Sequence, residues 1–199
     1  ILLKALSKFP EEVTFPYSLA TIYYNSGDFL KAENYFHDVL SKQPDMISAK
    51  HDLAMMYEEM NDTHRSDSLF LHMIHQNKND AVRRNDYAYI LSERNKISKE
   101  ELSLALELAT NAIAIEPDNA AFLDTIGWIY YKLGTYQIAE EYLEKSLSIN
   151  DNNPVILEHL GDIYVKLNKS IEAVNIYNQV LSIDSDNQLI KDKINNIYE

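Results

Sequence analysis

Two stretches of the chain decide its fold: LDTIGWIYYKLGTYQIAEEYLEKSL at residues 123–147 and LEHLGDIYVKLNKSIEAVNIYNQVL at residues 157–181. They align at an offset of 34 residues, which pairs Gly127 with Gly161. A glycine inside a helix costs about 1 kcal/mol relative to alanine, so its recurrence needs a physical reason. Close approach of two helices is such a reason, and the recurrence therefore predicts a repeated helix–helix contact.

The same offset extends through the whole chain and predicts an all-α fold of repeated helix pairs. Apolar residues recur at spacings of three and four, as in Ile126, Ile129 and Leu133, and strand alternation is absent. Each first helix carries a small residue that we expect to face a small residue of the second helix. The first-helix residues are Ala20, Ala54, Ala88, Gly127 and Gly161, and the second-helix residues are Ala32, Ser66, Ala105, Ala139 and Ala173.

We expect one continuous array over residues 1–199. Its predicted parts are a partial second helix at 1–9, repeats at 13–46, 47–80, 81–119, 120–153 and 154–187, and a terminal or next-repeat helix at 188–199. The repeat 81–119 contains five extra residues, which fall in the polar segment 92–101 and predict a lengthened turn.

Composition excludes several classes of function. The 199 residues carry 18 Lys and Arg against 31 Asp and Glu, a formal charge of −13, which disfavours nucleic acids and anionic membrane surfaces as partners. No apolar run is long enough to cross a bilayer, so we expect no direct membrane insertion. The absence of cysteine excludes disulfides, zinc thiolates and thiol catalysis from this segment.

Small residues and aromatics at this spacing in a 34-residue helix pair resemble the tetratricopeptide repeat. The resemblance covers essentially the whole chain and is strongest in 120–187. It implies a right-handed α-α superhelix whose concave groove is lined by the first helices. The chain also resembles long bacterial repeat proteins, several of them attached to the cell envelope or periplasm.

The positions expected to line the groove are rich in aromatic and acidic residues. Aromatic side chains offer large contact areas at low entropic cost, and adjacent carboxylates favour a partner that bears Lys or Arg. For Trp128 and Tyr131, a contact platform and simple packing against the neighbouring repeat remain equal alternatives. The predicted partner-binding residues are Tyr17, Tyr24, His51, Met55, Asn85, Tyr89, Asp124, Trp128, Tyr131, Glu158 and Asp162.

We expect neither catalysis nor a cofactor. His72 and His75 stand three residues apart on a helix, but two imidazoles are a weak metal signal, and we expect no metal. Phosphate-binding glycine loops and catalytic motifs such as HExxH are absent from the sequence.

The sequence therefore predicts a non-catalytic scaffold that binds a peptide segment of a partner protein, with basic and apolar residues, in the concave groove. The alternative is a module for self-assembly within a longer protein, in which the apolar faces at 1–9 and 189–198 pack on copies or on further repeats.

Overall fold

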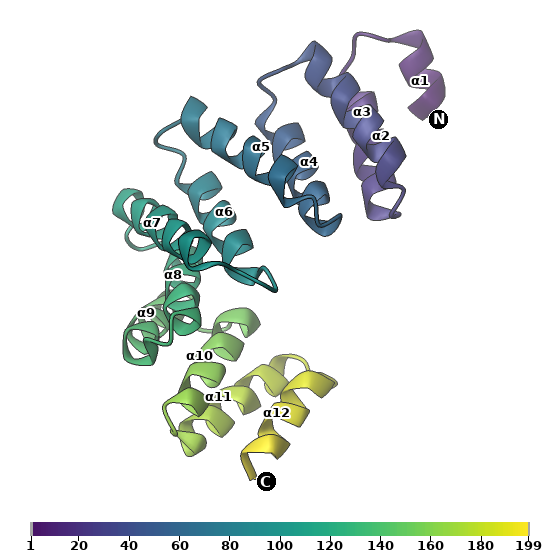
Figure 1. The fold of residues 1–199 in the computed structure, drawn as a ribbon. Helices are drawn as coiled ribbons and strands as arrows, with labels where there is room; N and C mark the ends of the chain where they lie inside the picture. The colour runs from purple at the N-terminus through teal and green to yellow at the C-terminus, as the bar shows by residue number, and fades with distance from the viewer. Residues whose placement is uncertain (1, 199) are drawn as a thin grey trace. The chain divides into compact units, whose positions relative to one another are not determined.

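The computed structural model describes residues 2–198, and within them all regular structure is helical (Figure 1). Ile1 and Glu199, which end the predicted segments 1–9 and 188–199, lie outside the described residues. The chain divides into two compact units, residues 1–78 and 79–199, and each is described by itself. That the repeats form one continuous array across both units stays a prediction.

The first unit contains a short helix followed by two helix pairs. Its helices are α1 (Leu2–Lys8), α2 (Thr14–Asn25), α3 (Phe29–Lys42), α4 (Ile47–Glu59) and α5 (Thr63–Gln76). Helix α2 packs on α3, α4 packs on α5, and α3 also contacts α4. The buried face of α3, which includes Phe36 and Val39, joins Leu53 and Met56 of α4 in one core.

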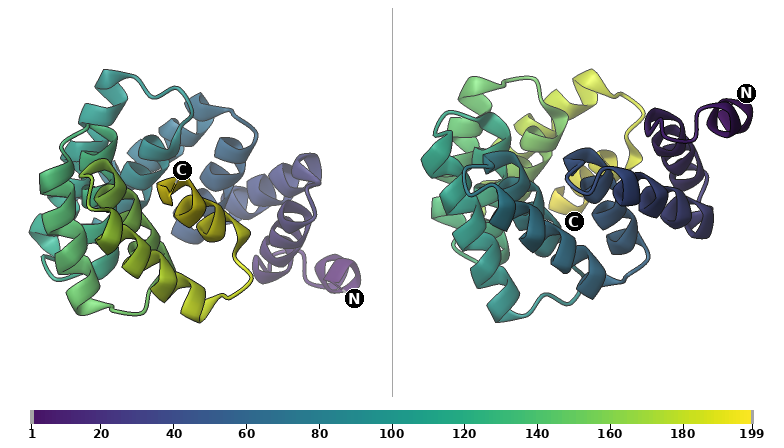
Figure 2. Two further views of the ribbon diagram at one scale, coloured as in Figure 1. Left: turned by 90° about the horizontal axis from the view of Figure 1, so that it is seen from below. Right: turned by 90° about the horizontal axis from the view of Figure 1, so that it is seen from above.

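The second unit contains three helix pairs followed by a last helix. Its helices are α6 (Ala81–Glu93), α7 (Lys99–Ile115), α8 (Ala120–Lys132), α9 (Tyr136–Ile149), α10 (Pro154–Lys166), α11 (Ser170–Ile183) and α12 (Gln188–Tyr198). Helices α6 and α7, α8 and α9, and α10 and α11 form the pairs, and each pair also contacts the next. Figure 2 shows these hairpins following one another from α6 to α12.

Three-residue turns join the helices of four pairs, and each turn contains one residue in the left-handed region. These residues are Gly27, Asn61, Gly134 and Asn168, with φ between 58° and 78°. Glycine and asparagine are the residues that tolerate this conformation best, and here each follows the C-cap of a first helix. The repeated polar turns of the sequence therefore have one shared backbone geometry.

The connection inside repeat 81–119 differs from the expected lengthened turn. Residues 94–98 form a five-residue connection, two residues longer than the other turns within pairs, and α7 has 17 residues where the other second helices have 14. The five extra residues are thus shared between the turn and an additional stretch of helix. A capping box explains the helical part, because Ser98 and Glu101 satisfy each other's backbone N–H groups at the start of α7.

The predicted small residues all lie in the core, but the glycines accommodate larger neighbours than expected. A Cβ atom placed on Gly127 would lie 1.9 Å from Cδ2 of Leu143. A Cβ atom placed on Gly161 would lie 2.3 Å from Cε1 of Tyr177, whose side chain is fully buried. Each glycine therefore makes room for the bulky residue one turn beyond the facing alanine, because that side chain reaches across the hairpin.

Candidate partner-binding face

The first helices present a surface whose polar side chains are linked from one repeat to the next. We call the surface formed by the predicted site positions of α2, α4, α6, α8 and α10 the first-helix face, taken separately in each unit. Its links join residues 35 positions apart, one more than the repeat length. Where the repeat has 34 residues, a side chain on one first helix therefore contacts the position just after its equivalent on the next first helix. Repeat 81–119 is five residues longer, so the equivalent of Glu93 on α8 is Lys132, and Trp128 contacts Glu93 from four positions earlier.

In the first unit, two predicted tyrosines are held by carboxylates of the next repeat. The hydroxyl of Tyr17 donates to Oδ2 of Asp52 at 2.7 Å, and that of Tyr24 donates to Oε1 of Glu59 at 2.5 Å. Burial, followed by these hydrogen bonds, raises the pKa of both phenols. The tyrosines thus link α2 to α4.

The other two predicted residues of the first unit lie on α4 and are half-buried. The ring of His51 packs edge-on against Phe70 of α5, with ring centroids 5.8 Å apart. Its Nδ1 atom lies 3.5 Å from Oδ1 of Asp52. Met55 lies one turn further along α4. His51 therefore contributes to packing within the repeat.

Trp128 stands at the centre of the first-helix face in the second unit. Its side chain is only 8% exposed, and its indole stacks on His159 of α10 at 4.1 Å and on Tyr131 at 4.6 Å between ring centroids. The indole Nε1 donates to Oε1 of Glu93 on α6 at 2.6 Å. Lys132 lies over the ring at 4.9 Å and also pairs with Glu93 at 3.2 Å. Trp128 therefore joins three consecutive first helices.

Asp124 is buried beside Trp128, with one carboxylate oxygen 2.8 Å from Nδ1 of His159. The His159 side chain is buried as well, so this pair lies between α8 and α10 away from bulk water. A carboxylate in such a place needs a polar partner, because burial without one costs several kcal/mol.

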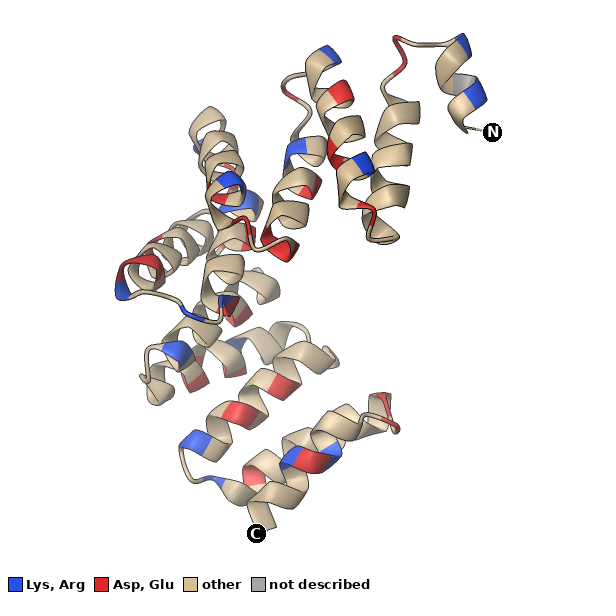
Figure 3. Cartoon of the chain, turned by 45° about the vertical axis from the view of Figure 1, so that its right-hand side comes forward, with Lys and Arg blue, Asp and Glu red and all other residues tan. Residues whose placement is uncertain are grey.

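At the C-terminal end of the face, Lys193 of α12 offsets part of the negative charge of two carboxylates. Its ammonium group lies 2.8 Å from Glu158 and 2.7 Å from Asp162, and Tyr177 donates a further hydrogen bond to Asp162 at 2.6 Å. Figure 3 marks acidic residues along α10 and residues of both charges along α12 on the ribbon. Two predicted acidic site residues are therefore already engaged within the chain.

The remaining predicted residues of the second unit differ in accessibility. Asn85 is buried in α6, whereas Tyr89 is 37% exposed on the same helix. Burial raises the pKa of the Tyr89 phenol, and the negative charges of Glu93, Asp124 and Glu158 raise it further. Tyr89 is thus an accessible aromatic ring in an acidic field.

For most of these linked pairs, the sequence predicts one residue as a site residue and does not reveal its partner. The missed residues are Asp52, Glu59, Glu93, Lys132, His159 and Lys193. The signal that could have revealed most of them is the complementary residue 35 positions away. For the 34-residue repeats this separation reflects a shift of about one residue between neighbouring first helices.

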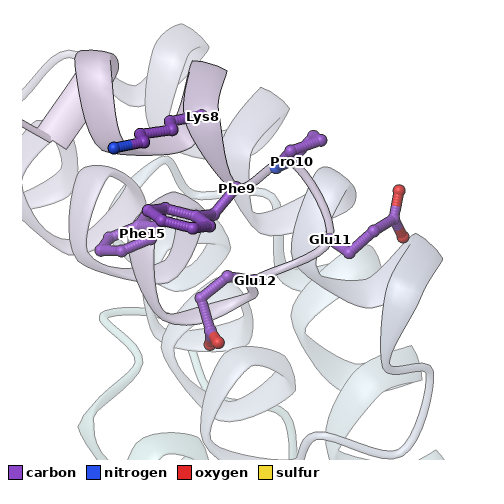
Figure 4. Close-up of a pocket in the computed structure, with 6 residues that line it drawn as sticks. All are labelled: Lys8, Phe9, Pro10, Glu11, Glu12 and Phe15. Atoms are coloured by element: carbon purple, nitrogen blue, oxygen red, sulfur yellow. The ribbon is translucent and has the colours of Figure 1, made fainter.

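Two pockets lie near the ends of the described chain. One, of about 640 Å³, lies where α1 joins α2 and is lined mainly by Phe9, Pro10 and Phe15 (Figure 4). Its two aromatic rings lie against each other at 6.4 Å, and it contains no predicted site residue. The other, of about 400 Å³, is lined by Tyr131 and Asp162 together with residues of α10, α11 and α12.

Among residues 2–198, no group of three or more His, Asp or Glu side chains is arranged to hold a metal ion. None of the helices described in the structure combines the length and the apolar character needed to span a bilayer.

Alkaline titration should show that some tyrosine phenols ionise at unusually high pH. Burial, aided by a 2.7 Å hydrogen bond to Glu33, raises the pKa of Tyr57 to about 12, and burial with a hydrogen bond to Glu144 raises that of Tyr164 to about 12. A raised pKa means that the neutral phenol favours the folded state. The stabilisation of the folded state by these neutral phenols should be complete below about pH 10, the ordinary tyrosine pKa. It should be lost as pH rises toward about 12.

Tyrosinate absorbance should therefore rise later for the folded chain than for the urea-unfolded chain. The variant Glu33→Gln should move the titration of Tyr57 toward lower pH, and Tyr57→Phe should remove that component. Identical titration curves for folded and unfolded protein would contradict this expectation.

The hairpins, their shared turns and the links between first helices define a helical-repeat protein. Residues 120–153 and 156–187 each match the family model described as a tetratricopeptide repeat. Residues 120–153 and 156–187 are therefore tetratricopeptide repeats, as the resemblance to that family predicts, and the chain shares the fold of tetratricopeptide-repeat proteins.

Solved structures share this fold at low sequence identity. A thermophilic tetratricopeptide-repeat protein of Thermus thermophilus is 19% identical, with 94% of this chain and 99% of that chain covered and a TM-score of 0.76. PilW, a widely conserved type IV pilus biogenesis factor, is 19% identical over 94% of this chain and 86% of its own, with a TM-score of 0.80. A repeat protein of Parabacteroides merdae is 16% identical, with 100% and 75% covered and a TM-score of 0.77.

Among curated proteins, none is significantly similar in sequence. Tetratricopeptide repeats generally serve as scaffolds for protein–protein interaction and are typically not catalytic, so the general class of function follows from the family.

Proposed function

We propose that the chain is a non-catalytic scaffold that binds a segment of a partner protein on the first-helix face of residues 79–199. The observation that carries this proposal is that the face is braced internally and still exposes apolar surface. Stacking and hydrogen bonds hold Trp128, His159 and Glu93 in place. On the same first helices, Tyr89 of α6 is 37% exposed, and Val165 of α10, which lines a pocket with Tyr131 and Asp162, is 40% exposed.

A braced surface suits binding because little side-chain entropy remains to be lost when a partner docks. Aromatic rings fixed in this way supply most of the energy in many interfaces. The open part of the face, around Tyr89 and Val165, is thus the preferred place for apolar side chains of the partner.

The partner segment should also carry Lys or Arg. Asp162 and Glu158 share the single positive charge of Lys193, so together they offer less attraction than their sequence suggests. Tyr89 differs, because three carboxylates act on its exposed phenol and a cation above its ring would gain from both the ring and the field. A basic side chain is therefore expected at Tyr89.

The test is selection of short displayed peptides on the folded chain, followed by titration of the selected peptides. Trp128 is the only tryptophan and lies within the face, so its fluorescence reports binding there. Selected peptides should combine apolar with basic residues, and they should bind more weakly at high salt. The double variant Tyr89→Ser/Val165→Ser should weaken binding by roughly tenfold or more, which is about 1.4 kcal/mol.

Ile138→Ser is the matched control, because Ile138 is 40% exposed on the second helix α9. It should bind the selected peptides like the unmodified chain. Peptides that bind the double variant undiminished would place recognition elsewhere.

Self-assembly is a second candidate, favoured by exposed apolar side chains at both ends of the chain. Leu3 and Phe9 are exposed around α1, and Leu189 and Tyr198 are exposed on α12. Sedimentation equilibrium should then show association that increases with concentration, and Tyr198→Ser should weaken it. A monomer at all concentrations would exclude this candidate.

A further inference from the structure

Exposed aliphatic side chains recur at one end of every hairpin in the second unit. Helices α7, α9 and α11 each end in isoleucine, and α10 and α12 each carry an aliphatic residue in second position. These side chains are between 42% and 57% exposed. We call this set the aliphatic edge: Ile115, Ile149, Val155, Ile183 and Leu189.

The members of the aliphatic edge share one local geometry. Four residues connect each second helix to the next first helix, at 116–119, 150–153 and 184–187. The last residue of each connection is an asparagine, Asn119, Asn153 or Asn187, whose side chain accepts from backbone N–H groups of the following helix. The connections are therefore alike, and the aliphatic residues on either side of them recur from hairpin to hairpin.

The same connections are strongly acidic. They contain Glu116, Asp118, Asp151, Asp184 and Asp186 and no Lys or Arg. An acidic side chain thus follows each isoleucine within two residues along the chain. The edge alternates aliphatic and acidic groups, and of the acidic ones Asp118 is paired with Lys145 of α9 at 3.2 Å.

The fold itself does not require this pattern. In the first unit, the residues that end α3 and α5 are Lys42 and Gln76, and the second residue of α4 is Ser48. The hairpins there form with polar residues at the corresponding positions. The aliphatic residues of the second unit therefore have a cause other than hairpin formation.

We propose that the aliphatic edge is a second interaction surface, which binds an extended segment of a partner protein with aliphatic residues at every third position and Lys or Arg between them. Neighbouring packed helices lie roughly 10 Å apart, and three residues of extended chain span roughly the same distance. Helices α9, α10, α11 and α12 each pack on the next, so aliphatic residues at every third position can meet Ile149, Val155, Ile183 and Leu189 in turn. The intervening basic residues then meet the acidic connections.

The negative charge of the aliphatic edge favours a basic partner segment over the other candidate occupants. A second copy of the chain would bring its own acidic connections against this edge, and the formal charge of −13 opposes that approach. An anionic lipid surface would be repelled for the same reason. A basic segment is the occupant that complements both the apolar and the charged groups.

The test uses a fluorescent peptide of Ile-Lys-Lys repeats, with an Ile-Glu-Glu peptide as the charge control. The basic peptide should bind the folded chain, and the acidic peptide should not. The variant Ile149→Gln/Ile183→Gln should weaken binding of the basic peptide by roughly tenfold or more. High salt should weaken it as well.

Ile138→Gln/Ile171→Gln is the matched control, because these exposed isoleucines lie near the opposite ends of the same helices α9 and α11. This variant should bind like the unmodified chain. Circular dichroism and thermal unfolding should show that both double variants are folded, since all four side chains are exposed.

Failure to bind the basic peptide, or equal binding by the edge variant and the unmodified chain, would overturn the inference. Loss of binding in Tyr89→Ser/Val165→Ser, with the edge variant unaffected, would place the peptide on the first-helix face. That result would refute the aliphatic edge and leave the proposed function standing. The displayed peptides selected on the folded chain test the proposed function of the first-helix face separately.

Discussion

Replacing Trp128 by alanine should lower the free energy of unfolding by roughly 3–5 kcal/mol, the usual cost of truncating a buried aromatic residue. The indole packs between repeats, stacking on His159 and donating to Glu93, so its removal leaves a cavity and takes one of two partners from Glu93, which keeps its ion pair with Lys132. Denaturant unfolding followed by circular dichroism measures the loss. Hydrogen exchange should place the weakened protection in residues 79–199.

Trp128→Phe is the matched control for this change. A phenyl ring keeps much of the stacking on His159 and Tyr131 but cannot donate to Glu93, so the loss should be nearer to about 1 kcal/mol. If Trp128 were instead an exposed contact platform, Trp128→Ala would unfold like the unmodified chain and lose only partner binding. Comparison of Trp128→Ala with Trp128→Phe therefore distinguishes packing between repeats from a contact platform, the two roles that the sequence leaves as equal alternatives.

The fold could be predicted because its determinants are local and repeated. Helical spacing, turn residues and the small residues at Ala20, Ala54 and Ala88 recur at one offset, so each repeat supports the assignment of the others. The insertion in repeat 81–119 was less predictable, since it occurs once. Its division between turn and helix depends on the capping box of Ser98 and Glu101.

The candidate site could be predicted only in part, because it depends on contacts between repeats. Helical periodicity places Asp124, Trp128 and Asp162 on the first-helix face, but it does not say how adjacent helices are shifted. That shift brings His159 to Asp124 and Lys193 to Asp162. It therefore determines which carboxylates remain available to a partner, and burial of Trp128 follows from the same packing.

Gly161→Ala should destabilise the protein by about 1–2 kcal/mol, although alanine favours helices by about 1 kcal/mol. The added methyl group would lie within 3 Å of three ring atoms of Tyr177. That ring cannot easily move, because it is fully buried and its hydroxyl donates to Asp162 at 2.6 Å. Overpacking should therefore outweigh the gain in helix propensity, and thermal or denaturant unfolding measures the balance.

Gly127→Ala is the control in the preceding repeat. There the nearest atom to the added methyl group is a terminal methyl of Leu143, which can rotate away, so this substitution should cost less than Gly161→Ala. Tyr177→Leu makes the second site like the first. In the double variant Gly161→Ala/Tyr177→Leu, the loss should be smaller than the sum of the two single losses by roughly 1 kcal/mol or more. Strictly additive losses would show that the ring of Tyr177 is not what requires glycine at this position.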